Sequence, residues 1–241
     1  MTPAALWSLT NSDGTLNLTF LRVINQVNPI MLALGAFFAV IGVAQSAGGI
    51  LLDASIPRVT PWFCHDQGCP RYTVKSSNDK FEIRNYEPSV WVATNLTVMT
   101  YTRAESTMMF YKLFGYIAGN NSLHMKIAMT APVLTEVYHG QGPDCESNFT
   151  MRFMVPFELQ ANPPAPLDPT VFIDRQPAIT MAVRQYGGFS TDELKMENLV
   201  ELTEALDNAT IPYLGNMFFT AGYDGPYAFK NRHNEIWVVP M

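Results

Sequence analysis

Two similar pairs of strands are predicted by the alternation of apolar and polar residues. The stretch Phe-Glu-Ile-Arg-Asn-Tyr at 81–86 alternates as a half-buried strand does, turns at Pro88 and resumes beyond it. A second stretch repeats this form around Pro177. We interpret the repeat as two β-hairpins of an internally duplicated chain. The predicted strands are 81–86 and 90–98 in the first pair, and 171–175 and 179–186 in the second.

A helix is predicted after each strand pair. The first runs from about residue 102 to 118, and Gly119 is a typical helix-ending residue. The second is predicted to begin at Ser190, because Ser190-x-x-Glu193 is a capping box. The predicted apolar faces are Thr107, Phe110, Tyr111, Phe114 and Ile117 in the first helix, and Leu199, Leu202 and Leu206 in the second.

Two further strands follow each helix, so the order β-β-α-β-β occurs twice. An amphipathic helix must bury its apolar stripe against a sheet. The sequence therefore predicts an α+β fold, a twisted antiparallel sheet or distorted open β-barrel with two helices, whose halves are joined by a proline-rich linker at 162–169. The later strands are predicted at 127–137 and 149–155, and at 217–223 and 235–239.

The first 70 residues differ from the patterned domain at 71–241. No charged side chain occurs from residue 23 to 52, and residues 30–44 are nearly all apolar. That apolar core is short for a bilayer-spanning helix and resembles the hydrophobic region of a signal peptide, followed by Ala44-Gln45-Ser46 as a cleavage signal. A retained membrane anchor and a buried core helix remain as alternatives. We expect a secreted or lumenal protein, which is anchored to the membrane only where residues 23–52 are retained.

Glycosylation sequons support entry into the secretory pathway. Four of them follow the apolar segment, and Asn17 begins another that precedes it. Each triplet arises often by chance, whereas four in one domain carry more weight. The predicted glycosylation sites are Asn95, Asn120, Asn148 and Asn208.

The cysteines agree with an oxidising compartment. Cys64 and Cys69 bracket a loop short enough for a local disulfide, which leaves Cys145 to pair elsewhere or stay free. A metal site at Cys64, His65 and Cys69 is the alternative, but it lacks the usual spacing of zinc ligands.

Charge and motifs exclude several function classes. The net charge is −6 and the isoelectric point is about 5.2, without a basic run that would follow a phosphate backbone. The chain has no G-x-S-x-G elbow, no HExxH, no P-loop and no G-x-G-x-x-G. We therefore expect neither a nucleic-acid-binding protein nor an enzyme.

Six short stretches occur in order along residues 71–241, namely FEIRNYEP at 81–88, KIAMTAPV at 126–133, FMVPF at 153–157, VRQYGGF at 183–189, TAGYD at 220–224 and NEIW at 234–237. Together they resemble the SOUL family of haem-binding proteins, and its haem-binding protein 2 branch in particular. The resemblance implies a duplicated antiparallel sheet with two helices, and a shallow apolar site for haem or a related tetrapyrrole.

The resemblance also implies where haem would lie. One branch of the family is proposed to use an axial histidine at the position of Asn85, and an amide is a poor iron ligand. The other branch is thought to hold haem through the first helix, where Lys112 or Arg103 would pair with propionates. His124 is the candidate iron ligand near the end of that helix. The candidate haem contacts are Met108, Phe110, Lys112 and Phe114.

Two functional hypotheses follow. The first is a non-catalytic carrier or scavenger of haem or another tetrapyrrole in the secretory pathway. The second is a protein-interaction module on the same scaffold, with no role for haem.

Overall fold

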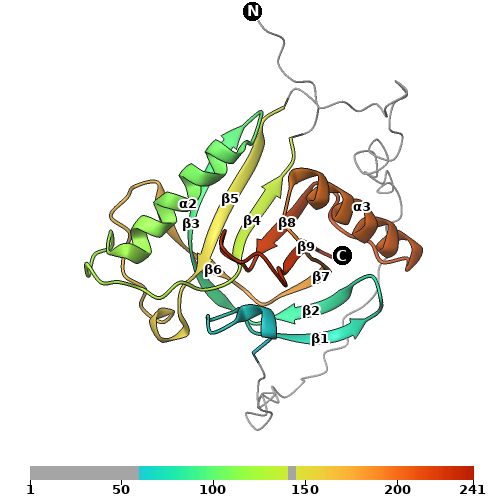
Figure 1. The fold of residues 1–241 in the computed structure, drawn as a ribbon, viewed down its shortest axis with the longest axis horizontal. Helices are drawn as coiled ribbons and strands as arrows, with labels where there is room; N and C mark the ends of the chain where they lie inside the picture. Colours follow the sequence, from blue (N-terminus) through green and yellow to red (C-terminus); the bar gives the residue numbers. More distant parts are fainter. Residues whose placement is uncertain (1–59, 141–144) are drawn as a thin grey trace, which may run out of the picture.

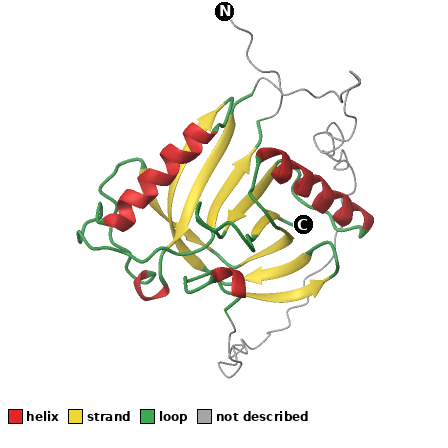
Figure 2. Ribbon diagram, viewed as in Figure 1, coloured by secondary structure: helices red, strands yellow, loops and turns green. Residues whose placement is uncertain are grey.

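One antiparallel sheet of nine strands carries two helices on the same face (Figures 1 and 2). The computed structural model describes residues 60–140 and 145–241, so the predictions for the leader and for Asn17 lie outside the described residues. The strands are β1 (Tyr72–Ser77), β2 (Glu82–Tyr86), β3 (Ser89–Val98), β4 (Val133–Tyr138), β5 (Ser147–Met154), β6 (Val171–Gln176), β7 (Ile179–Tyr186), β8 (Met217–Gly222) and β9 (Asn234–Val238), and the helices are α2 (Arg103–Ala118) and α3 (Asp192–Asn208) with short 3-10 turns η1 (Trp62–Cys64) and η2 (Phe157–Leu159).

The two predicted hairpins are wrong, although their strands form. β2 does not pair with β3; it pairs with β7 of the other half, and β3 pairs with β6. The order across the sheet is β1-β2-β7-β9-β8-β4-β5-β3-β6. The strands β2, β3, β4 and β5 of the first half correspond to β6, β7, β8 and β9 of the second half. When each strand after β1 is replaced by its counterpart, the order read from one end is the same as the order read from the other. The predicted duplication is therefore confirmed as a pseudo-twofold arrangement in which the halves exchange their first strands.

Two facing prolines explain why each pair of strands is interrupted. The register runs from Glu82 opposite Val183 to Tyr86 opposite Ile179, and it resumes with Ser89 opposite Gln176. Extended across the gap, this register would place Pro88 opposite Pro177. Neither proline has a backbone N–H to donate, so the ladder breaks there. The prolines that predicted hairpin turns instead interrupt one long ribbon.

α2 begins and ends as predicted but buries a different face. Thr102 forms a capping box with Glu105, and Gly119 closes the helix with a positive φ of 124°. The predicted face through Tyr111 and Phe114 is wrong, since both side chains are exposed. The helix is apolar almost all round, so its sequence did not fix the face. The buried side chains are Met109, Leu113, Tyr116 and Ile117.

α3 begins one residue later than predicted. The N-cap is Thr191, whose hydroxyl accepts a hydrogen bond from the backbone of Leu194 at 3.2 Å. The predicted cap, Ser190, instead shares a hydrogen bond with the Tyr186 hydroxyl. The predicted inner face is confirmed, because Leu199, Leu202 and Leu206 are all buried.

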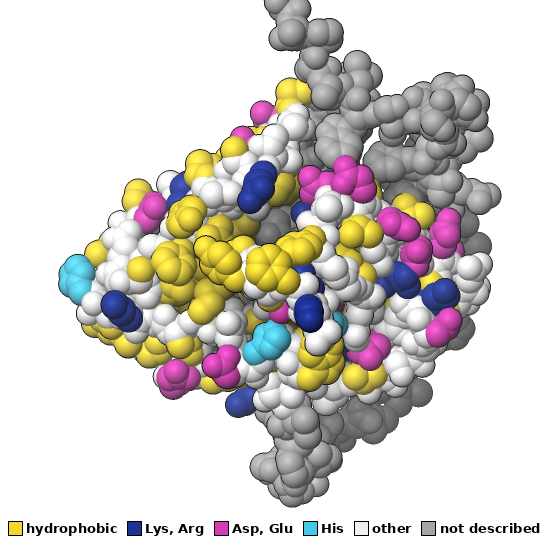
Figure 3. Space-filling view, viewed as in Figure 1, with side chains coloured by type: hydrophobic (Ala, Val, Ile, Leu, Met, Phe, Trp, Pro, Cys, Tyr) yellow, Lys and Arg dark blue, Asp and Glu magenta, His cyan; other side chains and the backbone are white. Residues whose placement is uncertain are grey.

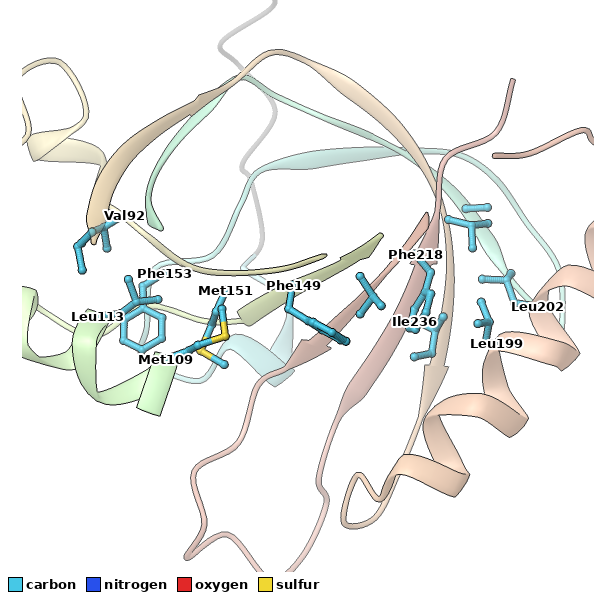
Figure 4. Packing of buried hydrophobic residues seen from close by; sticks show 14 of the residues in the cluster. Val92, Met109, Leu113, Phe149, Met151, Phe153, Leu199, Leu202, Phe218 and Ile236 are labelled. Carbon is cyan, nitrogen blue, oxygen red and sulfur yellow. The ribbon is translucent and has the colours of Figure 1, made fainter. Parts of the chain in front are cut away.

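The main core lies between the helices and the sheet. Figure 4 shows Met109 and Leu113 of α2 close to Phe153, while Leu199 of α3 lies on the side of Phe218. These side chains belong to one continuous apolar cluster, which ties both helices to a single sheet.

Two strand predictions need correction. Residues 127–132 are not part of the predicted strand, because the chain reaches β4 through a loop with a cis Ala131–Pro132 bond. The sequence analysis also missed β1, an edge strand whose residues are largely exposed and carry little apolar alternation. No described helix has both the length and the apolar character that crossing a membrane requires.

The exchanged strands predict that neither half folds alone. We expect residues 60–162 and 163–241, made as separate peptides, to lack a cooperative unfolding transition, because β2 needs β7 and β3 needs β6. Mixing the two peptides should restore the sheet, as measured by circular dichroism against the intact chain. A fragment 60–162 that unfolds cooperatively by itself would contradict the exchanged topology.

Candidate functional site

Most of the predicted haem contacts lie on the outside of α2. Met108, Tyr111 and Phe114 are exposed, and Phe110 is half-buried. We call these four residues the α2 aromatic surface. Figure 3 views the side of the molecule that carries α2 and shows hydrophobic side chains gathered across the middle of this face. Exposed apolar groups of this kind on a folded domain indicate a contact surface.

The α2 aromatic surface rests on the core. The ring of Phe110 packs against buried Phe153, with 5.2 Å between ring centroids. Phe114 lies almost parallel to Phe110, 6.0 Å away with 16° between the ring planes. Tyr111 meets both rings edge-on. The exposed rings of Tyr111 and Phe114 are therefore held by Phe110, which is itself packed on the core. They offer a flat ligand a preformed apolar platform.

Cationic groups flank this platform sparsely. Lys112 is half-buried and Arg103 is exposed in the first turn of α2. Hydrogen bonds from the hydroxyl and the backbone of Thr170 hold the pKa of Asp168 below its usual value, and the charge of Lys112 adds to this effect. Lys112 thus already has an anionic neighbour, which leaves Arg103 as the less engaged candidate for a propionate.

Asn85 lies apart from the α2 aromatic surface. It is on β2, and its side-chain oxygen accepts a hydrogen bond of 2.8 Å from the Thr180 hydroxyl across the β2–β7 pair. α2 packs on β3 and β5, whereas α3 packs on β7 and β9. Asn85 and the predicted haem contacts on α2 therefore lie over different halves of the sheet and do not form one site.

His124 stands in an exposed turn beyond α2. Its backbone has a positive φ of 49°, and its N–H donates to the carbonyl of Asn121 at 2.9 Å. Within residues 60–140 and 145–241, no group of three or more His, Cys, Asp or Glu side chains is arranged to hold a metal ion. An iron site at His124 would have this imidazole as its single protein ligand, and it stays a prediction.

A buried polar network, which the sequence analysis missed, lies on the sheet face away from the helices. Glu235 of β9 is fully buried and accepts four hydrogen bonds. Arg84 of β2 donates at 3.0 Å, and this ion pair is the strongest link across that part of the sheet. The other donors are Tyr223 (2.8 Å), Trp237 (2.8 Å) and His233 (2.8 Å).

The partners of Glu235 decide its charge. Burial alone would raise the pKa of this carboxyl, but the hydrogen bond from His233 and the charge of Arg84 outweigh it, so the pKa lies below its usual value. Burial, followed by the charge of Glu235, raises the pKa of the Tyr223 hydroxyl well above its usual value. The network therefore centres on a buried ion pair between Glu235 and Arg84, with Tyr223, Trp237 and His233 hydrogen-bonded to the same carboxylate.

The segment before β1 covers this network. The predicted disulfide between Cys64 and Cys69 is present, with 6.1 Å between the Cα atoms. Phe63 stacks on His233 at 3.8 Å and 3°, and His65 bonds to Asp224 at 3.0 Å. The ring of His233 is buried between Phe63 and Glu235.

Neither of two cavities in the described residues is lined by α2. One of about 40 Å³ lies between Trp91 and Trp237, far below the roughly 300–1,000 Å³ of ligand pockets. The other is a groove of about 340 Å³ between the β1–β2 turn and α3, where the charged side chains of Lys80, Glu201 and Glu204 line it beside Phe81 and Ala205.

The predicted glycosylation sites are all accessible. Asn95, Asn120, Asn148 and Asn208 are each exposed to solvent, as an acceptor asparagine must be. Cys145 is exposed and unpaired in the part of the chain that the structure describes.

Comparison with known proteins identifies relatives of this arrangement. A family model described as SOUL heme-binding protein matches residues 67–239. Heme-binding protein 2 from Homo sapiens is 40% identical over 159 residues, which cover 66% of this chain and 77% of that protein. Heme-binding protein 1 from Xenopus tropicalis is 27% identical over 159 residues, which cover 66% and 83%. A solved complex of EcmrR with DNA has a TM-score of 0.50 at 11% identity, covers 66% of this chain and 56% of that one, and shows similarity of fold alone.

The buried network predicts a large, pH-dependent loss of stability for Glu235→Gln. The substitution removes the fully buried counter-ion of Arg84 and leaves only the partly exposed Glu82, so we expect unfolding by urea at pH 7 to show a loss of about 3–5 kcal/mol. Because the folded pKa of Glu235 is lowered, its contribution is present above the unfolded pKa of about 4.3 and is lost as pH falls through the folded value. The difference between variant and wild type should therefore shrink in acid.

Glu82→Gln is the matched control for this substitution. Glu82 also bonds to Arg84, at 2.7 Å, but its side chain is 27% exposed. We expect a much smaller loss from this variant, and equal losses at the two positions would contradict the central role of Glu235.

Proposed function

Because the chain belongs to the SOUL heme-binding protein family, we propose that it binds haem or a related tetrapyrrole on the α2 aromatic surface, as a non-catalytic protein of the secretory pathway. The observation that carries this proposal is the set of exposed rings at Tyr111 and Phe114, supported from below by Phe110 and Phe153. We infer a carrier or scavenger role, because the family model and the relatives are described as heme-binding proteins.

The residues on α2 fit the apolar part of such a ligand. A bound tetrapyrrole supplies a flat apolar macrocycle with anionic propionates at one edge. Phe114 and Met108 would contact the macrocycle, and Met108 can adjust to an irregular outline. Arg103 and Lys112 would pair with propionates, the latter in competition with Asp168.

Iron coordination is the weaker part of the fit. Asn85 lies on β2 away from α2, and its amide oxygen is engaged by Thr180. His124 is exposed near the end of α2 and has an imidazole to offer. Affinity is therefore expected to depend on apolar contact, so iron-free porphyrins should bind nearly as well as haem.

Support for secretory placement comes from the same domain. Four sequon asparagines are exposed, and Cys64 is joined to Cys69. Short local disulfides persist in oxidising compartments and are rare in the cytosol. Residues 23–52 have the composition of a signal or anchor segment.

Phe114→Glu tests the ligand surface. We expect hemin titration of the purified chain, followed by the Soret shift, to show about tenfold weaker binding, because the charge removes roughly 60 Å² of apolar contact. Phe172→Glu is the control, since Phe172 of β6 is 39% exposed and Phe114 is 45% exposed. Equal affinity of the two variants, or no Soret shift with wild type, would reject this site.

Expression in a eukaryotic secretory host tests the location. We expect the chain to enter the secretory pathway and to lose mass on enzymatic removal of N-linked glycans, because its sequons are exposed. N-terminal sequencing of the product will show whether residues 23–52 are removed. A chain that stays in the cytosol and carries no glycan would reject secretory placement.

A further inference from the structure

A second group of exposed aromatic side chains lies away from α2. Trp62, Phe189, Tyr227 and Phe229 are between 52% and 86% exposed. We call them the loop aromatic patch. They come from three segments, namely η1, the β7–α3 connection and the β8–β9 connection. Neither the core nor the proposed haem site accounts for this exposure.

Contacts show that the three segments meet. The ring of Trp62 lies 5.6 Å from that of His233, which ends the β8–β9 connection. Phe189 and Phe229 meet edge-on at 6.4 Å. Arg232 lies 4.6 Å from the centre of the Phe189 ring. The patch is therefore one local surface formed by sequence-distant loops.

The β8–β9 connection holds its aromatic side chains outward. Arg232 donates to the carbonyls of Gly225 and Ala228 at 2.8 Å, and to that of Asp224 at 3.1 Å. The carboxylate of Asp224 accepts from the backbone of His233 at 2.7 Å. These bonds close the loop on itself, and Tyr227 and Phe229 face solvent on it.

The path of the chain indicates what covers this patch. Trp62 is two residues beyond the first described residue, Thr60, and residues 53–61 separate Trp62 from the uncharged stretch that ends at Leu52. Ten steps of extended chain span at most about 33–36 Å. A bilayer that held residues 23–52 would thus lie within that distance of Trp62.

The chemistry of the patch fits a lipid surface. Tryptophan and tyrosine are enriched where protein meets the headgroup region of a bilayer, because one part of each ring system is apolar and another part is polar. Lys230 and Arg232 on one loop are balanced by Asp192 and Glu193 at the start of α3. Because the charges around the patch are nearly balanced, zwitterionic lipid is favoured over anionic lipid.

We propose that the loop aromatic patch docks the domain on the surface of a phosphatidylcholine bilayer, with Trp62, Tyr227 and Phe229 at the headgroup level. The proposal rests on the secretory placement proposed above, because that is where residues 23–52 would meet a lumenal or outer leaflet. It adds a membrane orientation for the whole domain. The patch is the contact whether the chain is anchored or only peripheral.

The experiment uses the chain in the form in which a eukaryotic host secretes or retains it. Phosphatidylcholine vesicles with brominated acyl chains quench tryptophan that lies at the interface. Trp7 is replaced by Phe throughout, because it is present wherever the leader is retained. In that background we expect quenching with Trp62 present and loss of most of it in Trp62→Phe, because Trp91 and Trp237 are buried in the domain. Addition of phosphatidylserine should change the quenching little.

The double variant Tyr227→Ser/Phe229→Ser keeps Trp62 and tests the patch itself. We expect about tenfold weaker quenching per lipid, because two aromatic contacts with lipid are removed. Tyr111→Ser on α2 is the matched control and should behave as wild type with vesicles. Hemin affinity should be unchanged in the double variant, so failure of the haem proposal and failure of lipid docking are separable.

Three outcomes would overturn the proposal. The first is quenching that is absent in wild type, and the second is quenching that the double variant retains in full. The third is self-association of wild type without lipid, abolished in the double variant by sedimentation, which would assign the patch to a second copy of the chain.

Discussion

The exchange of strands between the two halves is the constraint on which the structure depends. β2 pairs with β7 of the other half as well as with β1, and β3 pairs with β6 of the other half as well as with β5, so both halves must be present before either completes its ladder. The facing positions of Pro88 and Pro177 interrupt the ribbon at its middle and allow each half to continue separately. Buried Arg84 adds a tie from β2 to Glu235 of β9, beyond the intervening β7.

This topology determines where a ligand can go. One face of the sheet is filled by α2 and α3, and the other is covered by the disulfide-closed segment at Phe63 and by the Glu235 network. The cavity between Trp91 and Trp237, of about 40 Å³, is too small for a tetrapyrrole, so the proposed site lies on exposed apolar surface. The strongest such surface on a regular element is on α2, where core packing of Phe110 fixes the rings outside it.

Sequence patterns predicted the elements better than their pairing. Alternation and capping located both helices and most strands, because these signals are local. Strand pairing is not a local property. Pro88 and Pro177 indicate hairpin turns in the sequence, but they serve equally well as a break in the ladder shared by the two halves. The buried face of α2 was predicted wrongly, because Met108, Tyr111 and Phe114 are as apolar as the side chains that are buried. Glu235 gave no signal, since an acid within a strand is usually solvated and only the fold brings Arg84 and His233 to it.

The two exposed aromatic surfaces differ in how they are held, and this difference argues for different guests. On α2 the rings of Phe110 and Phe114 lie nearly parallel, and Phe110 meets the core ring of Phe153 edge-on, so they form a rigid apolar surface that a planar molecule can contact without ordering anything. At the β8–β9 connection the rings project from loops that are fixed by Arg232 at their base and have little contact at their tips. Such tips suit a soft surface that adapts to them, as a lipid headgroup layer does. A single ligand that occupied both surfaces would have to match the rigid rings of the α2 aromatic surface and also the separate projecting rings of the loop aromatic patch. A tetrapyrrole does not match both.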